Sequence, residues 1–173
     1  MKKTIFALST PESVSAIAVI RISGPDTLNA LCLLCRCNVT SFKKKRTLTL
    51  KKIYSSENSL LDEALVVSFE ENKSFTNEQM AELHIHGSII VIKTVMETLS
   101  KMSFLRQAFP GEFTQRALEN NKLNLTQVEG LSDLLQAETE YQQKQALDTY
   151  TGKTNKKIIK WKNDVLKILS LIE

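Results

Sequence analysis

Hydrophobic and polar positions along the first 120 residues follow two different periods. Runs rich in apolar and β-branched residues, several of them alternating with polar residues, are typical of strands. They occur at residues 4–9, 16–23, 47–51, 63–69, 80–86 and 102–108. Helical spacing instead predicts helices over residues 27–35, 88–101 and 112–120. Because strands and helices interleave, the pattern predicts an α+β fold with helices packed on a mixed β-sheet.

The pattern changes towards the C-terminus. Thr126 to Glu129 is interpreted as a capping box, with Thr at the N-cap and Glu three residues later. Beyond it strand signals end, and apolar residues recur at helical spacing up to Ile172. We therefore expect a first domain, residues 1–120, followed by the first helices of a helical domain, residues 121–173. The last helix reaches Glu173 without a stop signal, which favours a piece of a larger protein.

Composition is that of a soluble globular protein. Of the 173 residues, 42% are hydrophobic and 24% are charged, which allows a packed core and argues against disorder. The net charge is +4, and the only dense basic run, Lys43–Arg46, continues to Lys51 and Lys52. Such runs usually form a solvated loop and strand edge. A direct RNA-binding role would need a platform of aromatic side chains for stacking, and the sequence does not indicate one beside this run, where Phe42 is the adjacent aromatic residue.

The sequence predicts a cytoplasmic protein with no membrane segment. The apolar run near the N-terminus stops at Ser9, too early for a signal peptide, and no apolar stretch approaches the roughly 18 residues of a membrane span. Three cysteines, Cys32, Cys35 and Cys37, are too few and odd in number for a disulfide framework. Cys32 and Cys35 fall at helical spacing and are interpreted as small core residues.

One apparent phosphate-loop motif fails on its spacing. Gly152, Lys153 and Thr154 would form its end, but the motif also requires a glycine at position 147, which is Leu147. The segment is therefore not expected to bind a nucleotide.

Arg21 and Glu82 are the most informative charged residues in the predicted strands. Arg21 interrupts an apolar run and must reach water, a carboxylate or an anionic ligand, because an unpaired buried guanidinium is prohibitive. Alternation places Glu82 on one strand face with His84 and His86, which could simply be the polar face of a half-exposed strand. Neighbouring residues on such a face lie about 6.5–7 Å apart, which disfavours a compact zinc site.

Lys122 follows a short predicted helix in a tight polar joint. Pro110 and Gly111 form a turn signal, and the helix is expected to end at Asn120–Asn121, since asparagine tolerates the left-handed conformation. Leu123 and Leu125 are interpreted as core anchors beside Lys122. A lysine held in this way can be directed at a ligand, although most lysines are solvated surface charges.

Three segments together resemble a known family. They are Arg21-Ile-Ser-Gly, Phe75-Thr-Asn-Glu followed by Glu82-Leu and His86-Gly, and Pro110-Gly-Glu-Phe followed by Lys122. In this order they are similar to the N-terminal part of the MnmE/TrmE tRNA-modification GTPases, over residues 4–150. Three departures concern the loop at 11–16, which lacks the usual glycines, Ser88 in place of a second glycine, and Phe109 where arginine is frequent.

The resemblance implies a role in modifying carbon 5 of the tRNA wobble uridine. The first domain would bind a reduced folate, 5-formyl- or 5,10-methylene-tetrahydrofolate, through Arg21, Glu82 and Lys122, and would form a homodimer. Redox steps would belong to a flavin-containing partner protein, and tRNA would bind to the full complex. GTP, potassium and magnesium would belong to a GTPase domain after residue 173. The chain alone would bind folate and self-associate without turnover, and no residue is assigned a catalytic role.

Two alternatives follow from the same residues. The chain could be a free-standing folate-dependent aminomethyltransferase, which would require a catalytic acid or base near the folate. It could instead be a dimerisation module whose loop changes have abolished folate binding. Ligand titration separates the second alternative from the folate-binding hypothesis.

Overall fold

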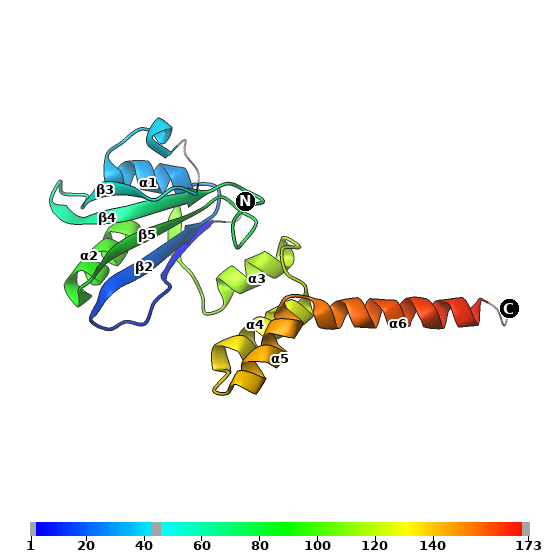
Figure 1. The fold of residues 1–173 in the computed structure, drawn as a ribbon. Helices are drawn as coiled ribbons and strands as arrows, with labels where there is room; N and C mark the ends of the chain where they lie inside the picture. The colour runs from blue at the N-terminus through cyan, green and yellow to red at the C-terminus, as the bar shows by residue number, and fades with distance from the viewer. Residues whose placement is uncertain (1–2, 43–45, 171–173) are drawn as a thin grey trace. The chain divides into compact units, whose positions relative to one another are not determined.

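The computed structural model describes residues 3–42 and 46–170 and contains two compact units, Met1–Asn120 and Asn121–Glu173 (Figure 1). Within the basic run, Lys43 to Lys45 lie outside the described residues.

The first unit is built on a six-stranded sheet with strand order β3-β4-β5-β2-β1-β6. Only the β1–β6 pairing is parallel among the described pairings, so the sheet is mixed. The strands are β1 (Thr4–Leu8), β2 (Ser15–Ser23), β3 (Thr49–Tyr54), β4 (Leu60–Phe69), β5 (Met80–Gly87) and β6 (Leu105–Gln107). The helices of this unit are α1 (Thr27–Cys35), the 3₁₀ turn η1 (Val39–Phe42), α2 (Ile89–Ser100) and α3 (Glu112–Glu119). The predicted α+β class with a mixed sheet is confirmed.

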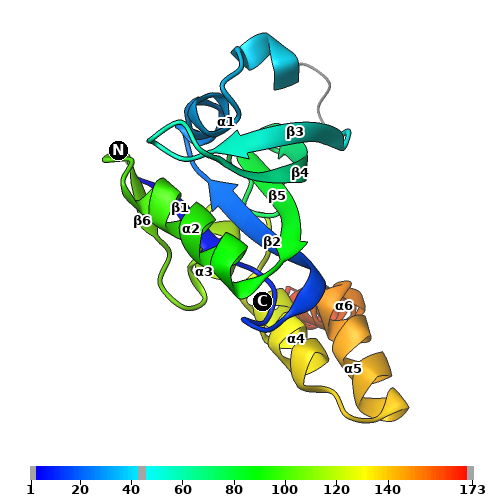
Figure 2. The same cartoon turned by 90° about the vertical axis from the view of Figure 1, so that its left-hand side faces the viewer.

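Helices α1 and α2 cover one face of this sheet (Figure 2). Alternation along the central strands turns small and branched apolar residues to that face, where they form one buried cluster with the helices. The cluster includes Ala18, Ile20 and Ile22 of β2, Ala81, Leu83 and Ile85 of β5, Leu31 and Leu34 of α1, and Ile92, Val95 and Leu99 of α2. The intervening residues belong to the opposite face, called here the second face: Leu50, Leu65, Ile17, Val19, Arg21, Glu82, His84 and His86.

Two strand predictions were wrong in extent. The strand expected at 47–51 runs instead from Thr49 to Tyr54. The strand expected at 102–108 is only Leu105–Gln107, because a turn precedes it in which the Leu105 N–H donates to the Met102 carbonyl at 2.9 Å. Cys35 is buried and Cys32 packs partly against the core, as predicted, and burial raises the pKa of Cys35 to about 12.

The second unit contains α4 (Leu125–Gln136), α5 (Glu140–Tyr150) and α6 (Lys153–Leu169). The predicted capping box at Thr126 and Glu129 was wrong: Asn124 is the N-cap, and its side chain accepts from the Gln127 N–H at 2.9 Å. Asn124 and Gln127 satisfy the same capping pattern two residues earlier, so the helix begins before Thr126.

Packing corrects one further prediction in this unit. Leu123 is buried as expected, but Leu125 is 61% exposed and is not a core anchor. Gly152 has φ 78° and is the N-cap of α6, so Lys153 and Thr154 stand in the first turn of that helix. Helix α6 has no buried residue in its described length. No helix in the described part of the chain has both the length and the apolar character needed to cross a membrane.

Gly87 ends β5 where the backbone of β2 comes close. A Cβ atom at this position would lie 2.2 Å from Ser15 Oγ and 2.3 Å from the Ser15 carbonyl oxygen. We expect Gly87→Ala to lower the free energy of unfolding by about 1–3 kcal/mol, because the backbone must shift to admit the methyl group. Denaturant unfolding measures this loss.

Ser88→Ala is the matched control at the next position. Ser88 is the N-cap of α2 but its side chain makes no capping hydrogen bond, so a change within about 0.5 kcal/mol is expected. If Gly87→Ala and the unsubstituted chain had equal free energies of unfolding, the backbones of β2 and β5 would lie further apart at Gly87 than the structure places them.

Candidate functional site

Arg21 and Glu82 meet across the two central strands on the second face. The antiparallel register of β2 and β5 places them directly opposite each other. Arg21 donates from Nε and from Nη2 to the same oxygen, Glu82 Oε1, at 3.0 and 2.8 Å. Their side chains are 27% and 17% exposed, so the pair is accessible but largely desolvated. The structure thus brings together two of the three residues singled out in the sequence, and Glu82 is the carboxylate that Arg21 requires.

Two aromatic rings accompany this pair. The Arg21 guanidinium carbon lies 5.5 Å from the Phe75 ring centroid and 5.8 Å from that of Phe113, distances typical of cation–π contacts. Both rings are half-buried. Neither residue was selected from the sequence, although each lies in a segment that carries the family resemblance. Their proximity depends on a loop and a helix far apart in sequence, so no local pattern could reveal it.

The two histidines of β5 turn to different carboxylates. His84 Nε2 lies 3.5 Å from Glu82 Oε2, is buried, and has no hydrogen-bond partner among the described residues. His86 Nδ1 contacts Asp62 Oδ1 at 2.7 Å. Among residues 3–42 and 46–170, no cluster of three His, Cys, Asp or Glu side chains is arranged to hold a metal ion. The second face therefore presents a carboxylate, a cation, an imidazole and two aromatic rings.

A buried ionic network fixes the helix that carries Phe113. Glu112 is 7% exposed and accepts hydrogen bonds from Arg106 Nη1 at 2.7 Å and from Arg116 Nη2 at 3.1 Å. These hydrogen bonds, those from Arg106 above all, together with one from the Phe109 N–H, lower the pKa of Glu112 to about 2. From sequence, Glu112 was expected only to favour the first turn of the helix.

The same network reaches the loop that carries Phe75. Arg116 Nη1 donates to Glu78 Oε2 at 2.9 Å, and the Ser23 hydroxyl donates to the same oxygen at 2.9 Å. Ser23 Oγ also lies 2.7 Å from Thr76 Oγ1, which is fully buried. Helix α3, the 74–79 loop and β2 are thereby joined around Arg21. The rings of Phe75 and Phe113 thus stand on a rigid support.

Lys122 lies in the second unit, two residues beyond Asn120. It is exposed and follows Asn121, whose φ of 56° is the left-handed conformation expected after the helix. Asn120 itself is tied to the first unit: its side chain donates to the Thr76 carbonyl at 2.7 Å and its carbonyl accepts from Asn77 Nδ2 at 3.1 Å. Asn120, at which the polar turn predicted before Lys122 begins, is therefore held by two hydrogen bonds.

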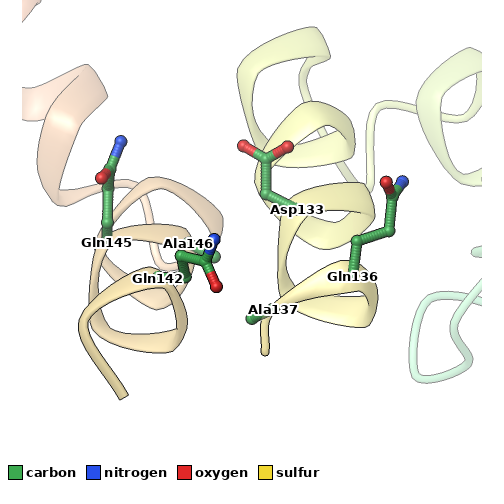
Figure 3. A pocket seen from close by; sticks show the side chains of 6 residues that line it. All are labelled: Asp133, Gln136, Ala137, Gln142, Gln145 and Ala146. Atoms are coloured by element: carbon green, nitrogen blue, oxygen red, sulfur yellow. The ribbon is translucent and has the colours of Figure 1, made fainter. Parts of the chain in front are cut away.

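A separate pocket of about 310 Å³ lies between α4 and α5 (Figure 3). Its lining carries amide groups and a single carboxylate, and none of the residues selected from the sequence; the lining residues are Asp133, Gln136, Ala137, Gln142, Gln145 and Ala146. Figure 3 shows these side chains projecting from the two helices without a common focus. The Arg21–Glu82 pair is the better candidate site.

Comparison with known proteins decides the family. The family described as GTP-binding protein TrmE N-terminus matches residues 4–122. The chain belongs to the TrmE N-terminal family. The match includes Arg21, Glu82 and Lys122.

Relatives of this TrmE N-terminal chain match it along nearly its whole length. The tRNA modification GTPases MnmE of Dinoroseobacter shibae and of Ruegeria are each 44% identical to it, covering 98% and 99% of the chain but 39% of each relative. That of Anaplasma phagocytophilum is 44% identical over 98% of the chain and 37% of its own length. The chain thus spans about two fifths of the curated relatives it matches.

The buried carboxylate of Glu112 should make folding sensitive to acid. Because its pKa falls from 4.5 to about 2 on folding, its contribution is present above pH 4.5 and is lost as the pH falls towards 2. We expect Glu112→Gln to cost about 3 kcal/mol near neutral pH, and the cost to shrink through this acidic window. Urea unfolding of both proteins across the pH series measures the difference.

Glu63→Gln serves as the control for this experiment. Glu63 pairs with Lys52 at 3.7 Å on the surface, with both side chains about half exposed, so a loss of no more than about 0.5 kcal/mol is expected. A cost for Glu112→Gln that is equally small, or independent of pH, would contradict the role assigned to the network.

Proposed function

We propose that this chain is the tetrahydrofolate-binding N-terminal region of a GTPase that modifies carbon 5 of the tRNA wobble uridine. The observation that carries the proposal is the Arg21–Glu82 pair, partly desolvated and lying beside Phe75 and Phe113. Membership of the TrmE N-terminal family and the printed names of the relatives support the link to tRNA modification.

The chemistry of the pair suits the pterin ring of a folate. The ring edge presents two adjacent N–H donors, on N3 and on the 2-amino group, and a carboxylate can accept both, as it does with the fork of an arginine. The half-buried rings of Phe75 and Phe113 offer apolar surface for a flat heterocycle. The glutamate tail of the folate is anionic, and Arg21 or Lys122 would neutralise it.

The role of the region would be binding and positioning. The reduced folate, 5-formyl- or 5,10-methylene-tetrahydrofolate, would supply the one-carbon unit, and the protein would hold it in place. GTP binding with potassium and magnesium would belong to the part of the relatives that this chain does not span, and oxidation and reduction to a flavin-containing partner. The tRNA would be bound by the complete assembly in the cytoplasm.

Calorimetric titration with 5-formyl-tetrahydrofolate tests the folate site. The chain should bind saturably, and Glu82→Ala, Arg21→Ala and Lys122→Ala should each weaken binding by about tenfold or more, as expected for the loss of a charge-assisted contact. Glu63→Ala and Lys101→Ala remove exposed charges elsewhere and should leave the affinity unchanged.

Absence of binding by the folded chain would contradict the folate proposal and leave an assembly module. Binding that Glu82→Ala does not weaken would place the ligand elsewhere.

We also propose that the first unit self-associates through the apolar part of its second face. Leu50 and Leu65 are cross-strand partners on this face and are 62% and 39% exposed, and Leu65 is in turn paired with His84. Ile17 on β2 adds a third apolar side chain, 54% exposed. Exposed apolar side chains on one face of a sheet favour burial against a second copy.

Sedimentation equilibrium tests this surface. The chain should sediment with twice its own mass, and Leu50→Glu should return it to the mass of one chain, since a carboxylate cannot be buried in an apolar interface without large cost. Ile90→Glu, on α2 and 64% exposed, should remain dimeric. Dissociation by Ile90→Glu but not by Leu50→Glu would assign the interface to the other face.

A further inference from the structure

We propose that the Arg21 guanidinium occupies the position that the ligand's ring edge takes, so that ligand binding displaces Arg21 from Glu82. The position, called here the ring seat, consists of Glu82, Phe75 and Phe113. This inference rests on the folate function proposed above, and it assigns to Arg21 a competing role that a simple contact would not have.

The first support is chemical equivalence. The ring edge of a pterin is a cyclic guanidine: its C2 carbon carries three nitrogens, and two of them present parallel N–H donors. Arg21 presents the same flat group, and donates two N–H bonds to Glu82 at 3.0 and 2.8 Å. Its guanidinium carbon also lies over the Phe75 and Phe113 rings. Arg21 therefore makes with the ring seat both kinds of contact that the pterin edge would make.

The second support is the way in which Glu82 is occupied. Both Arg21 nitrogens donate to Oε1, and a carboxylate oxygen accepts about two hydrogen bonds through its two lone pairs. A ring edge that binds side-on needs one acceptor on each oxygen. Arg21 must therefore surrender at least one of its bonds before the ring edge can bind. This competition would lower the apparent affinity of the chain for the ring.

The third support is what Arg21 can do after release. It is 27% exposed, and its long side chain can swing while its Cα stays fixed in β2. A released guanidinium is a cation without a partner beside the seat, and the carboxylates of a folate tail can pair with it. Arg21 would thus oppose binding of the ring and favour binding of the tail. The site would then select tail-bearing folates over free pterins.

Titration of Arg21→Ala with three probes tests this role. Methylguanidinium should bind Arg21→Ala but neither the unsubstituted chain nor the double variant Arg21→Ala/Glu82→Gln. The tail-less 6-methyl-tetrahydropterin should bind Arg21→Ala about tenfold more tightly than the unsubstituted chain, and 5-formyl-tetrahydrofolate about tenfold less tightly. Methylguanidinium and the pterin should compete for one site.

Two further variants control the experiment. Arg21→Lys keeps the charge but lacks the planar fork, so it should also gain affinity for the pterin, and it keeps the test available if Arg21→Ala does not fold. Arg36→Ala removes another guanidinium that lies over an aromatic ring, 4.3 Å from the centroid of Tyr54, and should change none of the three affinities.

The outcomes separate this inference from the folate function. If 5-formyl-tetrahydrofolate binds the unsubstituted chain but neither Arg21 variant gains affinity for the pterin, Arg21 does not occupy the ring seat. The inference about Arg21 is then overturned, while the folate-binding proposal stands. If methylguanidinium binds Arg21→Ala and no folate or pterin displaces it, the seat does not serve the ring, and both proposals fail. A gain for the pterin combined with a loss for the folate supports the inference.

Discussion

The antiparallel pairing of β2 and β5 organises the first unit. Its register turns Ile20 and Leu83 into the core beneath α1 and α2, and by the same alternation turns Arg21 and Glu82 to the second face. A slip of one residue would bury the ion pair and expose the core, which would be prohibitively costly. The core therefore holds the charged pair in place.

A second interaction organises what surrounds this pair. Arg116 is 3% exposed and joins Glu112 of its own helix to Glu78 of a distant loop, so that α3 and the loop keep a fixed relation to β2. Breaking such a buried pair leaves an uncompensated charge, which makes alternative arrangements unfavourable. The ionic network thus supports the aromatic rings, while the Arg21–Glu82 pair lies on the second face and is partly exposed.

How much of this could be predicted from the sequence depends on the range of the interaction concerned. Period and β-branched content identified every strand of the sheet, and alternation placed Glu82 and His84 on one face. The end of the short helix could also be predicted, because asparagine tolerates the left-handed conformation, and Asn121 does adopt it. Each of these features depends on the type of a residue and of its neighbours in the sequence, so the sequence alone can predict it.

The remaining features depend on contacts between distant residues. Phe75 and Phe113 were not selected, because their meeting over Arg21 requires the loop and α3 to be folded. Arg116 was missed because its partner Glu78 lies 38 residues away. The start of α4 was misplaced because two overlapping capping boxes compete locally, and only the structure shows that Asn124 rather than Thr126 caps the helix.

We propose above that the second face of the sheet binds the ring of a reduced folate at Glu82. A crystal structure of the chain with 5-formyl-tetrahydrofolate tests it most directly. We expect N3 and the 2-amino nitrogen to lie within about 3 Å of the two Glu82 oxygens, with Arg21 turned away from at least one of them. A folate bound elsewhere, with both Arg21–Glu82 hydrogen bonds intact, would contradict it.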